Sequence, residues 1–347
     1  VVRVPVDYAA LRKLPYPVGI ALRIGAFAGP FAAEDEPARV ILGLAESVLH
    51  EAKAQQVTVR ELQIDFDAAE SKLAGYRVWV EAIRRRVAPM PVVITTLPSW
   101  LDSPAFASLV QAADAFVLQV HSFERPADSR TPFELCVPAR ARRAVERAGA
   151  LGRPFQVALP TYGYLVAFDA TGKFVGLSAE GPVKTWPAKI QLHEVRTDPA
   201  AMAELVRHWS GVRPATLTGI IWYRLPTERD VLNWRWPTLA AVMQGRTPEA
   251  KLTVALRRPE AGLVEVELAN AGEADHFGLA VLALRWPVGT LVASDALGDF
   301  AKVDATTRSL QFRAQGQALR LGPGERRMVG WLRFKDHAEV EVQIVPR

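Results

Sequence analysis

Apolar runs and helical patterns alternate along the first two thirds of the chain. Between residues 18 and 226, six short apolar runs predict strands, and the amphipathic segments between them predict helices. The predicted strands are 18–27, 57–67, 91–97, 115–123, 155–164 and 219–224, and the predicted helices are 35–55, 71–87, 104–112, 137–151, 199–210 and 237–244. Near-continuous apolar strands that alternate with helices indicate parallel βα units buried on both faces.

This alternation predicts a TIM-type (β/α)8 barrel over residues 1–247 that lacks its first strands. A complete barrel has eight strands, and the pattern predicts six, with Val1–Val6 as the tail of one more. A doubly wound open sheet is the alternative, although no glycine-rich phosphate loop follows any predicted strand. The segment 165–192 is expected to be a loop over the barrel.

The pattern changes near residue 247. Short runs with period-two alternation follow, separated by turn signals such as Asn270–Gly272 and Gly322–Gly324. No long helix is predicted there, and the strands are expected at 251–256, 263–268, 278–285, 309–313, 328–334 and 340–345. These features predict an all-β sandwich over residues 248–347, joined through a polar linker near 245–250.

Composition narrows the classes of function. The chain has 347 residues, of which 50% are hydrophobic, and its net charge of +5 is too small to indicate a nucleic-acid partner. It has no apolar stretch long enough for a transmembrane segment. Cys136 is the one cysteine, and no histidine–cysteine cluster has metal-ligand spacing, so neither a metal nor another cofactor is expected. The chain begins with Val1 rather than Met, which indicates a removed leader or a fragment.

The sharpest chemical feature is QIDFD at the end of a predicted strand. Side chains alternate along a strand, so Gln63, Asp65 and Asp67 share one face. Two carboxylates that lie close together tend to raise the pKa of one and leave the other ionised, which suits a proton donor and a stabilising anion. Two structural alternatives are that Asp67 caps the next helix and that the pair binds an arginine.

Two more strand ends carry polar side chains. Gln119 and His121 share a face of their strand, where they could hydrogen-bond sugar hydroxyls. Tyr162 and Tyr164 lie in an irregular strand exit that contains a proline and a glycine. Active sites of (β/α)8 barrels lie at the carboxyl ends of the strands, so all four residues are candidates for substrate binding. A structural histidine and tyrosines packed at the rim are the alternatives.

The last predicted strand and the third one complete the candidate set. Trp222 and Arg224 share one face, where the indole could form a floor under a sugar ring and the guanidinium could pair with a carboxylate. Thr95, Thr96 and Trp100 are expected to line the same mouth. A core tryptophan is the alternative for Trp222.

Several of these stretches resemble a family of uncharacterised bacterial proteins, domain of unknown function 3142. Besides Tyr76, the matching stretches are QIDFD (63–67), ITTLPSWL (94–101), VLQVHSF (117–123), LPTYGY (159–164), WYRLP (222–226) and VGWLRF (329–334). The resemblance implies a glycosidase-type barrel in a protein that is exported to the periplasm or lipid-anchored, which would account for a missing leader.

The chain is also similar, more loosely, to chitinase-like glycoside hydrolases. Their fourth strand ends in a D-x-x-D-x-D-x-E motif, and Asp65 and Asp67 match its middle and last aspartates. Trp222 matches a tryptophan on their last strand. Leu62 and Ala69 replace the first aspartate and the glutamate, which is the general acid of that family.

Two hypotheses of function follow. The first is a glycoside hydrolase acting on a polysaccharide or envelope glycan, with Asp65 and Asp67 as the acid and the stabilising carboxylate. Two positions on one strand end do not place carboxylates on opposite sides of a bond, so Glu124 and Glu228 are candidates for a second acid. The second hypothesis is a non-catalytic glycan-binding or scaffold protein with a degenerate barrel. A phosphate-binding α/β protein ranks last.

Overall fold

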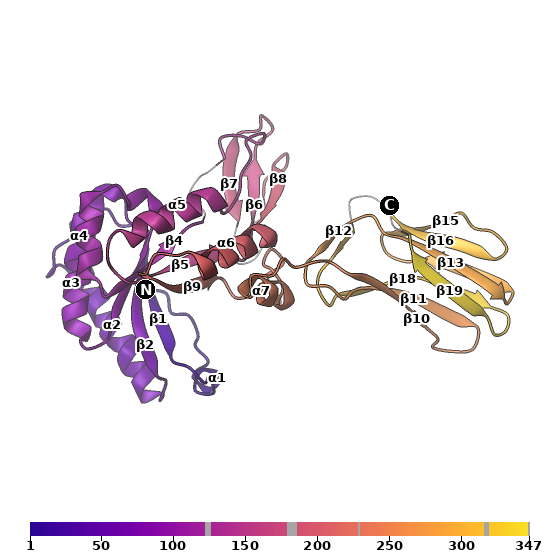
Figure 1. Cartoon of the computed structure of the whole chain (residues 1–347), viewed down its shortest axis with the longest axis horizontal. Coiled ribbons are helices and arrows are strands. Elements are labelled where there is room, and N and C mark those ends of the chain that lie inside the picture. The colour runs from indigo at the N-terminus through magenta and orange to yellow at the C-terminus, as the bar shows by residue number, and fades with distance from the viewer. Residues whose placement is uncertain (122–125, 179–185, 228–229, 316–318, 346–347) are drawn as a thin grey trace. The chain divides into compact units, whose positions relative to one another are not determined.

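The computed structural model describes residues 1–121, 126–178, 186–227, 230–315 and 319–345 (Figure 1). The chain divides into two compact units. The first comprises Val1–Thr197 and His208–Leu225, and the second comprises Asp198–Arg207 and Pro226–Arg347. No helix in these described ranges is long and apolar enough to cross a membrane.

The first unit is built on a six-stranded parallel sheet that forms a half-barrel. Its strands lie in the order in which they occur in the chain: β1 (Val18–Ile24), β2 (Val59–Phe66), β3 (Val92–Thr96), β4 (Ala115–Gln119), β5 (Phe155–Pro160) and β9 (Leu217–Tyr223). The six predicted strands are therefore confirmed. In the described part of the chain, β1 and β9 are the two edges of this sheet, so a closed eight-stranded barrel is not formed there.

Helices connect the parallel strands, as predicted. They are α2 (Glu36–Ala54), α3 (Leu73–Val87), α4 (Pro104–Ala112), α5 (Pro138–Gly149) and α6 (Pro199–Gly211), with short helical turns η1 (Glu70–Lys72) and η2 (Pro98–Trp100). Asp35 begins α2 because its side chain accepts a hydrogen bond from the Ala38 amide at 2.9 Å. Phe66 of β2 packs against Trp79 of α3, with ring centroids 6.2 Å apart. One face of the sheet is thus held by the helices, and the other face is left for a site.

Two predictions about irregular segments were wrong. Val1–Val6 is not part of a strand; these residues are exposed and precede a short helix, α1 (Tyr8–Leu11). The segment 165–192 is not simply a loop. It contributes to an antiparallel three-stranded sheet of β6 (Gly163–Phe168), β7 (Phe174–Ser178) and β8 (Gln191–Arg196). An apolar cluster that includes Tyr164, Val166 and Phe168 holds this sheet, and the apolar run of β6 could have indicated a strand here.

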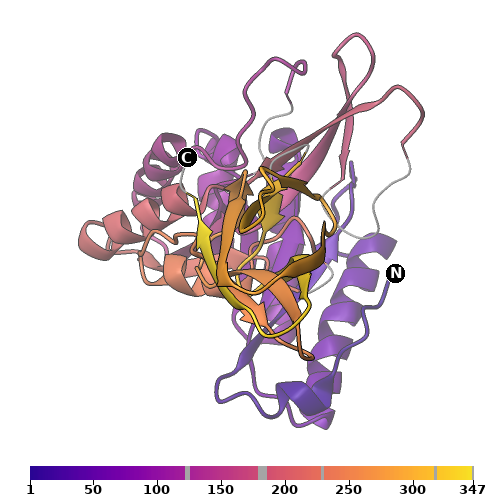
Figure 2. The same ribbon diagram turned by 90° about the vertical axis from the view of Figure 1, so that its right-hand side faces the viewer.

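The second unit contains two four-stranded antiparallel sheets. The first has the order β10 (Leu252–Arg257), β11 (Leu263–Asn270), β18 (Arg326–Phe334) and β14 (Leu291–Ala296). The second has the order β15 (Phe300–Val303), β16 (Ser309–Ala314), β13 (Val281–Val288) and β19 (Glu339–Ile344). The pair β12 (His276–Gly278) and β17 (Leu319–Leu321) completes the set. Figure 2 shows these strands, coloured orange to yellow, nearly end-on.

The two four-stranded sheets share one core, which is the arrangement of a β-sandwich. Val264 and Leu332 of the first sheet belong to the same buried cluster as Leu284 and Phe312 of the second. The alternation along these strands explains the packing, since every second side chain faces the core. The predicted boundary between residues 247 and 248 falls between α7 (Trp236–Met243) and β10.

Candidate functional site

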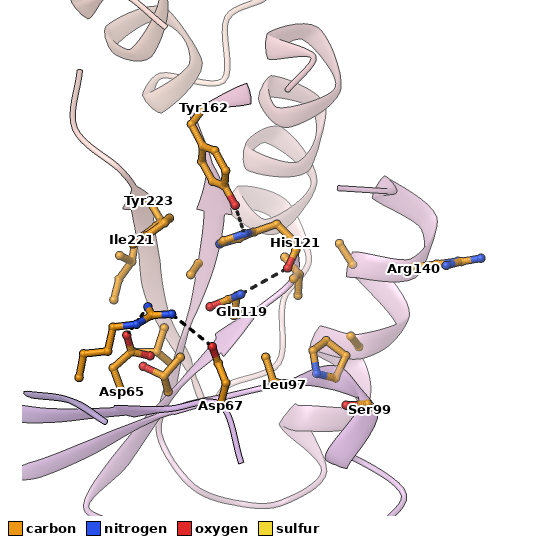
Figure 3. Close-up of a pocket in the computed structure, with 18 of the residues that line it drawn as sticks. Asp65, Asp67, Leu97, Ser99, Gln119, His121, Arg140, Tyr162, Ile221 and Tyr223 are labelled. Atoms are coloured by element: carbon orange, nitrogen blue, oxygen red, sulfur yellow. Dashed lines mark hydrogen bonds and ion pairs between the residues drawn. The ribbon is translucent and has the colours of Figure 1, made fainter. Parts of the chain in front are cut away.

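A cavity of about 850 Å³ lies at the carboxyl ends of the parallel strands (Figure 3). Its lining follows the strand alternation, because residues two apart on a strand point to the same side. Val117, Ala158 and Ile221 form the apolar floor, and the first two belong to a buried cluster with Val93. The polar side chains that the strands and strand ends contribute above this floor are Arg23, Gln63, Asp65, Asp67, Thr95, Gln119, His121, Tyr162 and Tyr223.

An arginine joins the two aspartates of QIDFD. The Arg23 guanidinium on β1 lies 2.9 Å from an Asp65 carboxylate oxygen and 3.5 Å from an Asp67 oxygen. The alignment of Arg23 with Asp65 in the parallel register places these groups side by side. The side chain of Asp65 is 20% exposed and that of Asp67 is 49% exposed. The structural alternative of an arginine partner for the pair therefore holds.

The two carboxylates have different environments. Partial burial raises the pKa of Asp67, the neighbouring Asp65 carboxylate raises it further, and the Arg23 guanidinium opposes both effects. Asp65 instead has the shorter contact with the Arg23 guanidinium. The pair therefore places the carboxyl of Asp67, whose pKa is raised, beside a carboxyl that Arg23 holds closely.

Aromatic side chains form the opposite wall of the cavity. The imidazole of His121 stacks on the ring of Tyr223, with centroids 5.6 Å apart and an interplanar angle of 18°. His121 Nδ1 is hydrogen-bonded to the Tyr162 hydroxyl at 3.2 Å, and that hydroxyl lies 3.1 Å from the hydroxyl of Tyr164. Figure 3 shows Tyr162, His121 and Tyr223 on the side of the cavity away from Asp67.

His121 is neutral at ordinary pH. Burial lowers its pKa from 6.5 to about 3, because the imidazolium would be removed from water. Its Nε2 is buried and has no hydrogen-bond partner among the described residues. A buried polar atom without a partner costs stability, so a ligand hydroxyl is a natural partner for Nε2.

The two glutamines lie between the carboxylates and the aromatic wall. The Gln63 amide donates to the Thr95 hydroxyl at 2.8 Å, which fixes Thr95 in the cavity. The Gln119 amide donates a long hydrogen bond of 3.4 Å to the His121 carbonyl. The amide oxygen of each glutamine is a possible hydrogen-bond acceptor.

The structure brings eight of the expected site residues together in the cavity lining: Gln63, Asp65, Asp67, Thr95, Gln119, His121, Tyr162 and Tyr164. Four others do not line it. Thr96 and Trp100 are buried: the Thr96 hydroxyl donates to the Val117 carbonyl at 3.0 Å, and the Trp100 ring packs on Phe106 at 5.9 Å.

Trp222 and Arg224 are not among the residues that line the cavity, whereas Ile221 and Tyr223 are. Trp222 lies on the opposite face of β9 from Ile221 and Tyr223, so the prediction that Trp222 lines the mouth was wrong, and Tyr223 takes the expected position. Arg224 follows the last residue of β9, and its guanidinium lies 5.7 Å from the centroid of the Tyr162 ring.

Sequence reasoning missed Arg23 and Tyr223. A signal for Arg23 exists, because it is the one charged residue in the apolar run VGIALRI. Thr95, which was expected at the mouth with Thr96 and Trp100, is the one of these three that lines the cavity. The proposed second acids, Glu124 and Glu228, lie outside the described residues.

Other groups in the described part of the chain offer no further chemistry at this site. No cluster of three or more His, Cys, Asp or Glu residues suited to a metal ion occurs there. Cys136 is buried, and burial, together with the charge of Glu134, raises the pKa of its thiol to about 12. A thiol in this state is a poor nucleophile.

Comparison with solved structures found distant similarities. The chain is similar to chitinase ChiA74 from Bacillus thuringiensis, with 11% identity, a TM-score of 0.39, and coverage of 90% of this chain and 77% of that one. It is also similar to a chitinase from Chromobacterium violaceum, with 16% identity, a TM-score of 0.45, and coverage of 70% and 84%. The Bacillus cereus spore cortex-lytic enzyme SleL has 12% identity, a TM-score of 0.47, and coverage of 70% and 63%.

A search of curated proteins found no match to this chain. A family model described as domain of unknown function (DUF3142) matches residues 21–228, which is more than half of the chain. The matched range begins within β1 and ends after β9, so it includes part of β1 and the other five strands of the half-barrel. The chain therefore belongs to the DUF3142 family.

Proposed function

We propose that this protein is a glycoside hydrolase whose active site is the cavity of the half-barrel. One observation carries the proposal: a carboxylate pair joined by Arg23 faces an aromatic and imidazole wall across a cavity of about 850 Å³. A carboxylic acid beside a carboxylate is the usual chemical requirement for glycoside cleavage. Aromatic rings with a few convergent polar groups are suited to sugar rings, which have apolar C–H faces and hydroxyl edges.

The two carboxylates divide the roles. Asp67 is the proton donor to the glycosidic oxygen, because its raised pKa keeps the acid form populated at higher pH. The Asp65 carboxylate lies 2.9 Å from the Arg23 guanidinium and is placed to stabilise the positive charge that develops on the sugar ring. Arg23 holds both carboxyl groups in place.

The opposite wall orients the sugar. Tyr223 is 36% exposed, so its ring can stack on the C–H face of a pyranose. Neutral His121 offers Nε2 to a hydroxyl, and the hydrogen bond of Nδ1 with Tyr162 fixes the imidazole. Gln63 and Gln119 supply further hydrogen-bonding groups between the two walls.

A second candidate function is non-catalytic glycan binding. Asp65 and Asp67 both come from the end of β2 and share one arginine, so they lie on one side of the cavity. Catalytic carboxylates ordinarily flank the bond that they cleave. No other carboxylate is among the described residues that line the cavity.

Reducing-end release from a panel of neutral and envelope polysaccharides distinguishes the two functions. We expect Asp67→Asn to lower turnover about 10²- to 10⁴-fold, the usual contribution of a general acid. Asp102→Asn is the matched control, because Asp102 is an exposed aspartate in the same unit outside the cavity, and it should leave turnover unchanged. The wild-type rate should fall as pH rises through the Asp67 pKa.

The outcomes separate clearly. Turnover that survives both Asp65→Asn and Asp67→Asn shows that the cavity is not the active site. If the wild-type protein cleaves none of the panel but binds a glycan, and Tyr223→Ala abolishes that binding, the non-catalytic function is correct.

A further inference from the structure

The VGWLRF stretch places a tryptophan on the outer face of the sandwich, away from its core. On β18, Val329, Leu332 and Phe334 belong to the buried core of the second unit, whereas Trp331 is only partly buried. Strand alternation therefore turns Trp331 to the outer face of the sheet β10–β11–β18–β14. Trp331 has no part in the cavity of the first unit.

Two carboxylates flank this tryptophan in register. Glu265 of β11 lies directly opposite Trp331, and Asp295 of β14 lies opposite it on the other side. Residues directly opposite in antiparallel strands have side chains on the same face, close enough to touch one ligand. The sheet therefore presents a row in which an indole lies between two acidic side chains.

The row borders a hollow. A depression of about 490 Å³ is lined by Glu265, Trp331 and Arg333 together with small or apolar side chains, among them Ala293 and Met328. Ala293 lies opposite Arg333 in the register, so no large side chain on β14 covers the row next to the indole. A flat ligand ring can therefore approach this face of the sheet.

Some charged side chains on this face form ion pairs with one another, and others do not. Glu267 lies 3.1 Å from Arg326 and 4.0 Å from Arg257, and Arg333 lies 2.5 Å from Glu260. In contrast, neither Glu265 nor Asp295 forms an ion pair with another residue of the described ranges. One oxygen of Asp295 accepts the Ala296 amide at 2.9 Å. The acceptor oxygens beside Trp331 thus remain available to hydroxyl donors.

We propose that this face of the sandwich is a second, non-catalytic carbohydrate-binding site that takes a pyranose unit of a neutral glycan. The indole covers the C–H face of the sugar, and the Glu265 and Asp295 carboxylates accept hydrogen bonds from hydroxyls at its edge. The same two carboxylates repel uronic acids and other acidic sugars. The proposal goes beyond the cavity and holds whether or not the cavity is catalytic.

The test uses the full chain with Tyr223→Ala, which removes the sugar platform of the cavity. Calorimetric titration with neutral hexasaccharides (cellohexaose, maltohexaose and N-acetylated chitohexaose) measures what remains. We expect Trp331→Ala to weaken binding of at least one neutral hexasaccharide about tenfold or more, and Trp331→Phe to restore part of it. Trp236→Ala is the matched control, because Trp236 is an exposed tryptophan of the same unit outside this hollow.

Several results would overturn the proposal. The first is no binding of any neutral hexasaccharide in the Tyr223→Ala background, and the second is equal affinity in Trp331→Ala and Trp236→Ala. The third comes from a titration with the protonated glucosamine hexamer: binding of that hexamer alone would indicate a cation site. Equal thermal midpoints of the variants show that loss of binding is not loss of folding. If the cavity does not hydrolyse any glycan, the result of each binding measurement stays the same. The proposal for the sandwich and the proposal for the cavity can therefore fail independently.

Discussion

Replacing His121 with phenylalanine should remove a pH-dependent instability of the fold. His121 is 1% exposed and has one hydrogen bond, between Nδ1 and the Tyr162 hydroxyl, while Nε2 has no partner in the described chain. Phenylalanine forfeits about 0.5–1.5 kcal/mol of hydrogen bonding but also removes an unpartnered buried atom that costs about 1–3 kcal/mol. We therefore expect the free energy of unfolding at neutral pH to stay within about 1 kcal/mol of the wild-type value.

At acidic pH, the free energies of unfolding of the wild-type protein and His121→Phe should differ. The folded pKa of His121, about 3, lies below the unfolded value of 6.5, so the unfolded chain binds one more proton between these limits. The wild-type protein loses stability as pH falls through this window, by about 1.4 kcal/mol per pH unit well inside it. Between about pH 7 and about pH 4.5, the wild-type protein should lose roughly 2–3 kcal/mol that His121→Phe does not lose.

Urea denaturation of both proteins at the two pH values measures this difference, and all other titrating groups cancel in the comparison. Tyr162→Phe is the control, because it removes the hydroxyl beside Nδ1 but leaves the imidazole buried, and it should retain the wild-type pH dependence. A difference below about 0.5 kcal/mol would show that His121 is not a buried neutral imidazole. A matched loss of glycan binding in His121→Phe would link Nε2 to the ligand.

Three further variants test the packing. Gly330→Ala should destabilise the sandwich by about 1–3 kcal/mol in urea denaturation, because the new Cβ would lie 2.4 Å from the Phe312 ring; no change would refute this packing. Gly43→Ala meets nothing within 4 Å in α2 and should stabilise by about 0.5–1 kcal/mol. Asn270→Ala loses its hydrogen bonds to four backbone groups and should cost at least about 3 kcal/mol. Cys136 should react with a thiol reagent only on unfolding, and rapid labelling of native protein would contradict its burial.

Sequence reasoning predicted the half-barrel well because its signals are local. Each strand of the parallel sheet is a near-continuous apolar run, and each helix shows apolar positions at helical spacing, so both are visible without tertiary information. Strands β14 and β15, by contrast, were not predicted from the sequence. Exposed residues such as Val292 and Lys302 interrupt any regular alternation there, and only pairing with β18 and β16 defines those strands.

The candidate site shows where such reasoning stops. Alternation correctly grouped Gln63 with Asp65 and Gln119 with His121, because a period of two fixes which residues share a face. It does not say which of the two faces is inward. On β9 both faces carry an aromatic residue, so Trp222 and Tyr223 were equally plausible, and only pairing with β5 places Tyr223 in the cavity. The contact of Arg23 with Asp65 likewise depends on the register between β1 and β2.

The chain enters the three-stranded sheet β7–β6–β8 after β5 and leaves it again at almost the same point. The Tyr162 carbonyl accepts hydrogen bonds from the Thr197 amide at 3.2 Å and the Thr197 hydroxyl at 2.8 Å, which clamps the two ends together. Tyr164, Leu177 and Ser178 of this sheet also line the cavity. A module closed at its base can change length at little entropic cost. Exchange of residues 163–196 between relatives would therefore change the shape of the cavity, while the strands that carry Asp65 and precede His121 keep their register. This segment is therefore a suitable place to exchange sequence when ligand selectivity is to be altered.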